Sequence, residues 1–333
     1  MLVQIQIFGK ITMKIGQRIL TTTISIVYIL MIVILAVSLY LRGLKNLEPV
    51  YIINISSEIF GMATGYVIYL CCLFDTQKTG ADNINFINML NMVMLGLFTD
   101  GVAWLVNGVP SLRWVNILDN TIYYSVTPIA SFLFFKYVLS FLQLGNVNRK
   151  LIGLYRFIRI TLVIDIIAIY LNIPFGYFFT VHADGIYERS TYTSVSMAYP
   201  FLILLTSLVL ILLGRKQLQK YRMVVLLLYV FVPLIVAIIT VFVYGLSINY
   251  SLLMLVMVLM YCVINIEQGR QKAVADRDLD TASNIQESML PKQFPPFPDR
   301  KELDIYAMMR PAKEVGGDFY DYFFVDDDNI ALV

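Results

Sequence analysis

Apolar residues dominate most of the chain and recur there in long stretches that hold few charges. A membrane-spanning helix needs about 20 predominantly apolar residues, and each stretch approaches or exceeds that length. The first stretch is longer than the roughly 7–15 apolar residues of a signal-peptide core, so we interpret it as a span. The pattern predicts a mostly α polytopic membrane bundle over residues 1–266. Its eight predicted spans are Ile19–Leu41, Val50–Phe74, Phe86–Val106, Ile117–Phe141, Phe157–Ile173, Tyr192–Leu213, Met223–Tyr244 and Ser247–Ile266.

The hydrophobic pattern changes after Ile266. Residues 267–290 are rich in Ala, Gln, Glu, Asp and Arg, which favours a helix that continues from the last span. A narrow apolar face recurs at intervals of three and four residues: Leu279, Ala282, Ile285 and Met289. Pro291 ends this signalling helix. The face suits a homodimer contact through residues 267–290, or packing against the chain's own downstream domain.

Composition supports this division. The chain has 333 residues, of which 59% are hydrophobic and 14% charged, whereas soluble domains average about 45–50% and about 25%. Residues 1–266 carry 17 Lys and Arg against 9 Asp and Glu, and residues 267–333 carry 8 against 14. A basic membrane domain is therefore followed by an acidic tail, and no nucleic-acid partner is expected.

Loop charge predicts the orientation in the lipid bilayer. With the N-terminus inside, the inner segments before the tail carry twelve positive residues and the outer loops carry four. The twelve are Lys10, Lys14, Arg18, Lys78, Arg149, Lys150, Arg156, Arg159, Arg215, Lys216, Lys220 and Arg222. Eight spans then place both termini in the cytoplasm.

Ionisable side chains interrupt several spans. Such groups are costly in lipid, so they usually face the bundle interior and often mark function. In the predicted topology several of them lie toward the outer side, where the loop 174–190 adds further charges. We hypothesise an outward-facing pocket for a small extracellular ligand, with these candidate residues: Glu58, Asp100, Asp119, Asp184 and Arg189. The alternative is a set of interhelical hydrogen bonds that only hold the bundle together.

The acidic tail, residues 291–333, has the pattern of a β-rich domain. Residues 303–310 and 319–325 are predicted strands, the run Asp326–Asn329 is a turn signal, and IALV begins a return strand. Before the hairpin stands EVGGDFYD, residues 314–321, in which two adjacent glycines allow close backbone approach. An aspartate follows them, and carboxylates are ligands that Mg²⁺ prefers. From these residues alone, a turn before a strand is the favoured interpretation.

A longer string changes that interpretation. NIQESMLPKQFPPFP (284–298) followed by AMMRPAKEVGGDFYDYFFVDDDNIALV (307–333) resembles the start of the SpoIIE/RsbU-type serine phosphatases, bacterial members of the metal-dependent PPM superfamily. The resemblance covers roughly the last 50 residues. It implies the opening of an α/β phosphatase domain with two Mn²⁺ or Mg²⁺ ions. It also implies a phosphorylated regulatory protein as substrate, such as an anti-sigma-factor antagonist, and a location in the bacterial inner membrane.

By motif position, the resemblance implies that Asp318 is a metal-site carboxylate and Asp321 a supporting acid, with Gly316 and Gly317 giving backbone access. The membrane domain resembles, more loosely, the multi-span sensor regions that precede bacterial diguanylate cyclases and phosphatases. The family's further metal aspartates would follow Val333, so we expect a truncated catalytic domain and no phosphatase activity from these 333 residues. The catalytic residues stay unknown. Alternative functions are a membrane receptor or scaffold without catalysis, and a transporter with a cytoplasmic stub.

Overall fold

The structure is a computed structural model that describes residues 2–74, 81–142, 149–242, 245–292, 294, 296–311, 314–326 and 329–333. Lys78, and Asp327 and Asp328 of the predicted turn, lie outside the described residues. The chain divides into two compact units, Met1–Val263 and Ile264–Val333. The helices are α1 (Leu2–Arg42), α2 (Pro49–Phe74), α3 (Ala81–Val106), α4 (Arg113–Phe141), α5 (Arg149–Phe175), α6 (Ala198–Leu213), α7 (Lys220–Phe242) and α8 (Asn249–Met289). Short 3-10 helices are η1 (Leu44–Asn46), η2 (Pro110–Leu112) and η3 (Thr193–Met197).

Seven helices among the described residues are long and apolar enough to cross a membrane. They are α1, α2, α3, α4, α6, α7 and α8, and they correspond to seven of the eight predicted spans. Helices α6 and α8 begin after the predicted Tyr192 and Ser247, and the predicted end at Tyr244 lies outside the described residues. Helix α5, the remaining predicted span, is not one of the seven, and Arg159 and Asp165 interrupt its apolar sequence. The prediction of a helical, membrane-type bundle is confirmed, with seven helices of spanning character and an eighth of comparable length.

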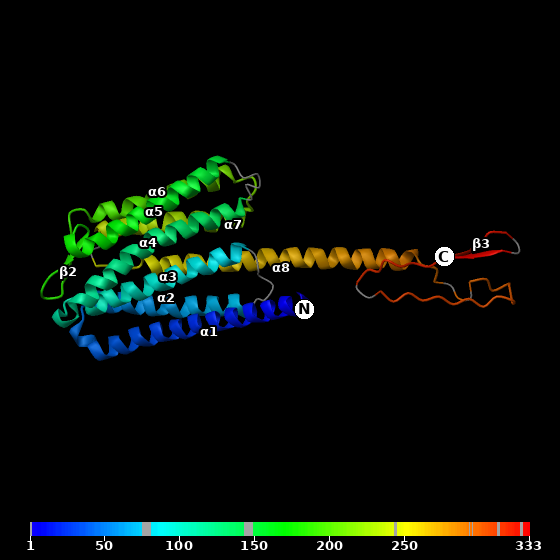
Figure 1. The fold of residues 1–333 in the computed structure, drawn as a ribbon, viewed down its shortest axis with the longest axis horizontal. Helices are drawn as coiled ribbons and strands as arrows, with labels where there is room; N and C mark the ends of the chain where they lie inside the picture. The colour runs from blue at the N-terminus through cyan, green and yellow to red at the C-terminus, as the bar shows by residue number, and fades with distance from the viewer. Residues whose placement is uncertain are drawn as a thin grey trace. The chain divides into compact units, whose positions relative to one another are not determined.

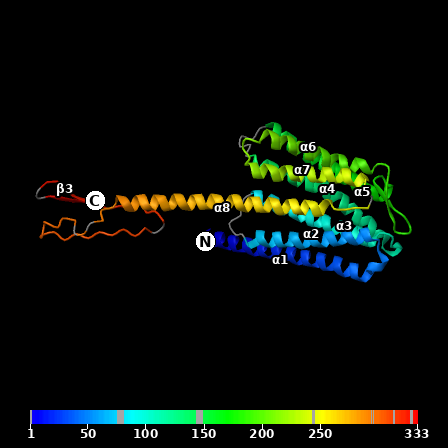
Figure 2. The same ribbon diagram turned by 180° about the vertical axis from the view of Figure 1, so that it is seen from behind.

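The first unit is a bundle of helices that run side by side (Figures 1 and 2). Helix α3 lies at its centre, in contact with α1, α2 and α4, and α4 also contacts α5 and α6. One face of α3 is fully buried. Met89, Val93 and Leu97 lie on it at intervals of four residues, the spacing of one helix face. Small residues allow close helix approach, as at Gly96, which faces the ring of Tyr250 on α8.

Large apolar side chains also cover the outside of the bundle. Ile53, Phe60 and Val67 recur every seven residues along α2, and all three are exposed. A seven-residue interval returns to the same helix face after about two turns. In water such a stripe would be costly, whereas lipid chains solvate it, so this surface suits a bilayer.

One end of the bundle carries a β-hairpin, and we call it the hairpin end. Strands β1 (Phe179–Val181) and β2 (Tyr187–Arg189) pair antiparallel between α5 and η3, with Val181 opposite Tyr187 (Figure 1). Phe178, Phe179 and Val181 form a buried cluster with Tyr124 of α4 and Ile169 of α5. This apolar cluster holds the hairpin against the ends of the two helices.

The second unit begins within α8. This helix continues without interruption from its apolar half to Met289, two residues before Pro291, as predicted for a helix that continues from the last span. Strands β3 (Tyr322–Phe324) and β4 (Ile330–Leu332) pair antiparallel, so the predicted hairpin is confirmed with a shorter first strand. The predicted strand over 303–310 is wrong, because a strand needs a hydrogen-bonded neighbour and none of the described residues pairs with this segment.

Candidate ligand site in the bundle and candidate metal motif in the tail

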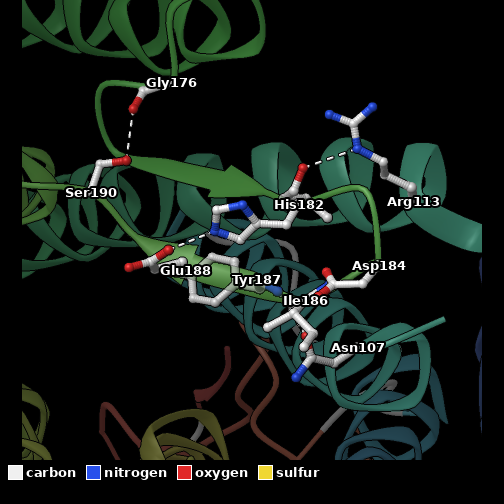
Figure 3. Close-up of polar contacts among 10 residues, drawn as sticks. Asn107, Arg113, Gly176, His182, Asp184, Ile186, Tyr187, Glu188 and Ser190 are labelled. Carbon is white, nitrogen blue, oxygen red and sulfur yellow. Dashed lines mark hydrogen bonds and ion pairs between the residues drawn. The ribbon is translucent and has the colours of Figure 1, made fainter. Parts of the chain in front are cut away.

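The turn of the β1–β2 hairpin is docked onto the chain between α3 and α4. The carbonyl oxygen of Gly185 accepts hydrogen bonds from the backbone amide of Gly108 at 3.0 Å and from Asn116 Nδ2 at 2.9 Å. Arg113 Nε donates to the carbonyl of Val181 at 3.0 Å, as the dashed line at Arg113 in Figure 3 shows. Gly185 has a φ of +83° and lies so close to the backbone of Val109 that a Cβ would be within 2.6 Å of it. Only glycine suits this contact.

Tyr187 of β2 connects the hairpin to three helices. Its backbone amide donates to Asn107 Oδ1 at 2.9 Å, and its hydroxyl shares a 2.7 Å hydrogen bond with the hydroxyl of Tyr124 on α4. Asn107 Nδ2 in turn donates to the Tyr51 hydroxyl on α2 at 3.1 Å, and the Tyr51 ring lies 4.8 Å from the ring of Trp104 on α3. The hairpin is therefore a fixed cover over the bundle and is more than a solvated loop (Figure 3).

Beneath this cover lies a cavity of about 280 Å³, close to the lower end of the size range of small-molecule sites. It is lined by Glu48, Val50, Tyr51, Asp100, Ala103, Trp104, Asn107, Asn120, Tyr123, Tyr187, Arg189, Gly245, Leu246 and Ser247. Most of its wall is aromatic and apolar, with amides and a few charges at defined points. This composition is typical of sites that bind small molecules.

Asp100 is the buried charge of the cavity wall, with 4% of its surface exposed. Ser247, just before α8, donates its hydroxyl to Asp100 Oδ2. Asn54 of α2 holds the same segment, since its Nδ2 donates to the carbonyl of Gly245 at 2.7 Å and its Oδ1 accepts from the amide of Ser247 at 3.2 Å. The segment that leads into α8 is thus bonded both to the cavity and to the neighbouring helix.

A second buried carboxyl group lies next to Asp100. Glu58 of α2 is completely buried, and its Oε1 accepts a hydrogen bond from Ser251, in the first turn of α8, at 3.2 Å. Ser251 also contacts the hydroxyl of Ser57 at 2.7 Å. Both buried acids are therefore hydrogen-bonded near the start of α8. Asp100 bonds the segment just before the helix, and Glu58 bonds its first turn.

The five candidate residues of the predicted pocket are distributed unevenly. Asp100 and Arg189 line the cavity. Glu58 and Asp119 are buried in the bundle wall and do not line it. Asp184 is exposed in the hairpin turn, where its Oδ1 accepts from the amide of Ile186 at 3.0 Å (Figure 3). Its observed role is to close the turn.

The aromatic and amide residues of the wall were not predicted. Their sequence signal is helical spacing from a charged residue, because Asp100 and Trp104 of α3 and Asn107, the residue after α3, recur at intervals of four and three. Asn116, Asn120 and Tyr123 repeat the same spacing on α4. Such rows of polar and aromatic residues on two adjacent helices predict that both helices line one cavity. Intramembrane charges alone do not give this prediction.

The tail motif is held by one side chain of α8. Gln286 Oε1 accepts from the amide of Gly316 at 3.0 Å, and its Nε2 donates to the carbonyls of Gly316 at 2.7 Å and of Asp318 at 3.2 Å. Gly317 has no neighbouring atom within 4 Å of where a Cβ would stand. Both Asp318 and Asp321 are exposed. The Asp321 Oδ1 accepts from the next backbone amide at 2.8 Å.

These residues do not form a metal site by themselves. Among the described residues there is no group of three or more His, Cys, Asp or Glu side chains placed to hold an ion. An Mg²⁺ or Mn²⁺ pair needs several oxygen ligands, whereas the motif offers the single carboxylate of Asp318 and its neighbour Asp321.

Fold and cavity together define a helical membrane-type protein with a cavity beneath the hairpin. A curated relative, Protein IcfG of Synechocystis sp. (strain ATCC 27184 / PCC 6803 / Kazusa), is 37% identical over 68 residues, which are 20% of this chain. The matched part spans about 10% of the length of that relative. No protein-family model matches the chain. No solved structure matches it.

Proposed function

We propose that the chain is a membrane sensor, in which a small molecule in the cavity controls a cytoplasmic phosphatase domain through α8. The observation that carries the sensing part is the position of residues 245–247. They line the cavity, and the helix that follows them runs to Met289 without a break. A site at one end of a continuous helix suits transmission along that helix.

The hydrogen bonds around Asp100 give the proposal a physical basis. A ligand group that binds the Asp100 carboxylate competes with the Ser247 hydroxyl for it. Loss of that bond weakens the connection between the cavity wall and the segment before α8. The Ser251–Glu58 bond lies one turn further along the chain, in α8, so a shift of the segment would also change this bond. Ligand binding thus changes which hydrogen bonds hold α8, and a ligand shifts an equilibrium only through such differences.

The phosphatase part rests on the tail motif. The proposed activity is hydrolysis of phosphoserine or phosphothreonine in a regulatory protein such as an anti-sigma-factor antagonist. The proposed cofactors are two Mn²⁺ or Mg²⁺ ions, for which Asp318 would supply one carboxylate and Asp321 support. The remaining ligands are not among the described residues. The hydrogen bonds from Gln286 to Gly316 and Asp318 support a link between the end of α8 and the motif.

The proposed location is the bacterial inner membrane, with both termini in the cytoplasm and the hairpin end outside. Loop charge supports this orientation. A homodimer through residues 267–290 is part of the proposal, because Leu279, Ile285 and Met289 of α8 are exposed apolar residues on one face.

The test of coupling uses the cavity itself. Ala103 lines the cavity, so Ala103→Phe should fill part of it and mimic an occupant, while Ala103→Ser is the matched control. In nanodiscs, hydrogen exchange of the amides in 267–290 and 314–318 should change in the Phe variant and stay as in wild type in the Ser variant. Identical exchange in all three proteins would contradict transmission through α8.

The phosphatase activity is tested on the protein expressed from its own gene. Hydrolysis of a phosphoserine protein with Mn²⁺ or Mg²⁺ should be abolished by Asp318→Asn, with Asp304→Asn, an acid outside the motif, as control. Equal hydrolysis by wild type and Asp318→Asn would contradict the role of Asp318. Absence of hydrolysis under every metal condition would favour a receptor without catalysis.

A further inference from the structure

The cavity carries charges of both signs on a wall to which four aromatic residues contribute. Asp100 is buried on α3, and Arg189 is on β2 of the covering hairpin. Glu48 lies at the exposed edge of the lining. The rings of Tyr123 and Trp104 belong to the same wall. No salt bridge joins Asp100 to a basic side chain among the described residues. The hydroxyl of Ser247 donates to Asp100, and the buried carboxyl group of Glu58 lies beside it.

From this arrangement we infer that the cavity binds a small zwitterion with an apolar body, the chemistry of a free α-amino acid. The inference rests on the proposed function, in which the cavity holds a small ligand. The ammonium group of the ligand lies at Asp100, and its carboxylate lies at Arg189. The apolar body is enclosed by the aromatic wall.

Other ligand classes leave one of the two charges without a partner. An anion would be compensated by Arg189 but repelled by Asp100, and repulsion is strong where water is excluded. A cation would pair with Asp100 but would leave the exposed Arg189 to solvent and to repulsion from the ligand. A neutral sugar could bond the amides of Asn107 and Asn120 but would compensate neither charge. A zwitterion pairs with both charges, and this pairing matters most at Asp100, because burial of a charge is costly unless it is paired.

The lining has the capacity for these contacts. A carboxylate offers about four acceptor positions, so Asp100 can accept from an ammonium in addition to Ser247. Ammonium groups are also attracted to the faces of Trp and Tyr rings, which Trp104 and Tyr123 provide. Arg189 presents a planar fork of donors that matches a carboxylate. Arg189 lines the cavity together with Tyr187 of the same strand.

The experiment separates the two charges of the ligand. Full-length protein in nanodiscs is titrated with L-phenylalanine, with phenethylamine, which lacks the carboxylate, and with 3-phenylpropionate, which lacks the ammonium. L-leucine and its two analogues repeat the series with an aliphatic body. Heat of binding is measured, and Trp104 fluorescence gives a second signal in a Trp114→Phe background, since Trp114 is exposed and does not line the cavity.

We expect the amino acid of a series to bind about 10- to 100-fold more tightly than either analogue, the effect of one hydrogen bond to a charged group. Arg189→Gln should reduce affinity for the amino acid to that of the amine and leave the amine unchanged. Asp100→Asn should weaken both. Glu188→Gln is the matched control, because Glu188 lies on the same strand and does not line this cavity.

Arg189 is exposed on the hairpin, so its variant should fold even if a change at buried Asp100 does not. The inference is overturned if the amine or the acid binds as tightly as the amino acid, or if no member of either series binds. Coupling is scored separately by the Ala103→Phe exchange experiment. A positive result there without amino-acid binding would reject the ligand class and retain the sensor.

Discussion

The hairpin end of the bundle and the tail treat their polar groups in opposite ways. In the bundle, Asp100 and Glu58 are buried and each is hydrogen-bonded to a residue at the start of α8. In the tail, Asp318 and Asp321 are exposed, and the motif is held mainly by the side chain of Gln286. The first arrangement is an assembled site, whereas the second is a set of residues with one anchoring point.

The difference shows where each region obtains its order. The hairpin end is held by contacts with helices that lie far apart in the sequence. Removal of one contact therefore leaves polar groups of several elements without a hydrogen-bond partner. The tail unit draws on a few hydrogen bonds at partly or fully exposed positions, which are individually weak. Changes at the hairpin end should therefore have large effects on stability, and changes in the tail should have small, local ones.

Gly185→Ala should show the largest effect. Its φ is +83°, and the new Cβ would lie 2.6 Å from the backbone of Val109, which cannot move as a side chain can. We expect a loss of about 3 kcal/mol or more, from backbone strain and overpacking together, in thermal unfolding in detergent. Gly108→Ala is the control, with a φ of +72° and no atom within 4 Å. It should lose only about 1–2 kcal/mol. Equal losses would show that the hairpin contact adds nothing.

Gly96→Ala tests the contact between α3 and α8. The added Cβ would lie 2.4 Å from the ring of Tyr250, whose hydroxyl hydrogen-bonds Thr127 at 2.8 Å. The ring must shift, so we expect a loss of about 1–3 kcal/mol by the same melting assay. Gly153→Ala on α5 meets no atom within 4 Å and should instead stabilise by about 0.5–1 kcal/mol. A neutral result at Gly96 would argue against close packing of α8 in the bundle.

Asn54→Ala tests the hydrogen bonds that hold the segment before α8. Its completely buried side chain satisfies the carbonyl of Gly245 and the amide of Ser247. Leaving both unsatisfied should cost about 1–3 kcal/mol and speed the exchange of the Ser247 amide. Thr64→Val is the control, because the Thr64 hydroxyl bonds only a carbonyl of its own helix at an exposed position. Unchanged exchange at Ser247 would remove the support for its role in the proposed coupling.

Long apolar stretches made the helical bundle predictable, because burial in lipid leaves a compositional signal along each helix. The helix over 267–290 could be predicted equally well from the sequence, since its helix-forming residues and Pro291 act locally. The predicted strand at 303–310 was wrong because its alternation says nothing about a pairing partner. Strand pairing depends on a neighbour elsewhere in the chain.

The candidate site was predictable only in part. Intramembrane charge singled out Asp100, and loop charge singled out Arg189, both of which line the cavity. The same reasoning added Asp184, whose side chain closes a turn. It missed Trp104, since an aromatic residue in an apolar span carries no signal of its own, and it missed Tyr187 of the hairpin, since an aromatic residue in a loop carries none either. Their roles arise from the crossing of α2, α3 and α4 beneath the hairpin, which one sequence does not specify.

Gln286→Leu should have the smallest effect and would sharpen the contrast with the bundle. The change keeps an apolar stem of similar bulk but removes the amide group and with it the hydrogen bonds to Gly316 and Asp318. Because the site is half-exposed, water replaces much of what is lost, and we expect about 1 kcal/mol or less of local stability to be lost. Exchange of the Gly316 amide should speed up several-fold while the melting temperature of the bundle stays unchanged. Glu287→Gln, which removes only an exposed ion pair with Lys292, should alter neither. A fall in bundle stability with Gln286→Leu would show that the two regions are not independent. It would contradict the expectation that changes in the tail have only small, local effects.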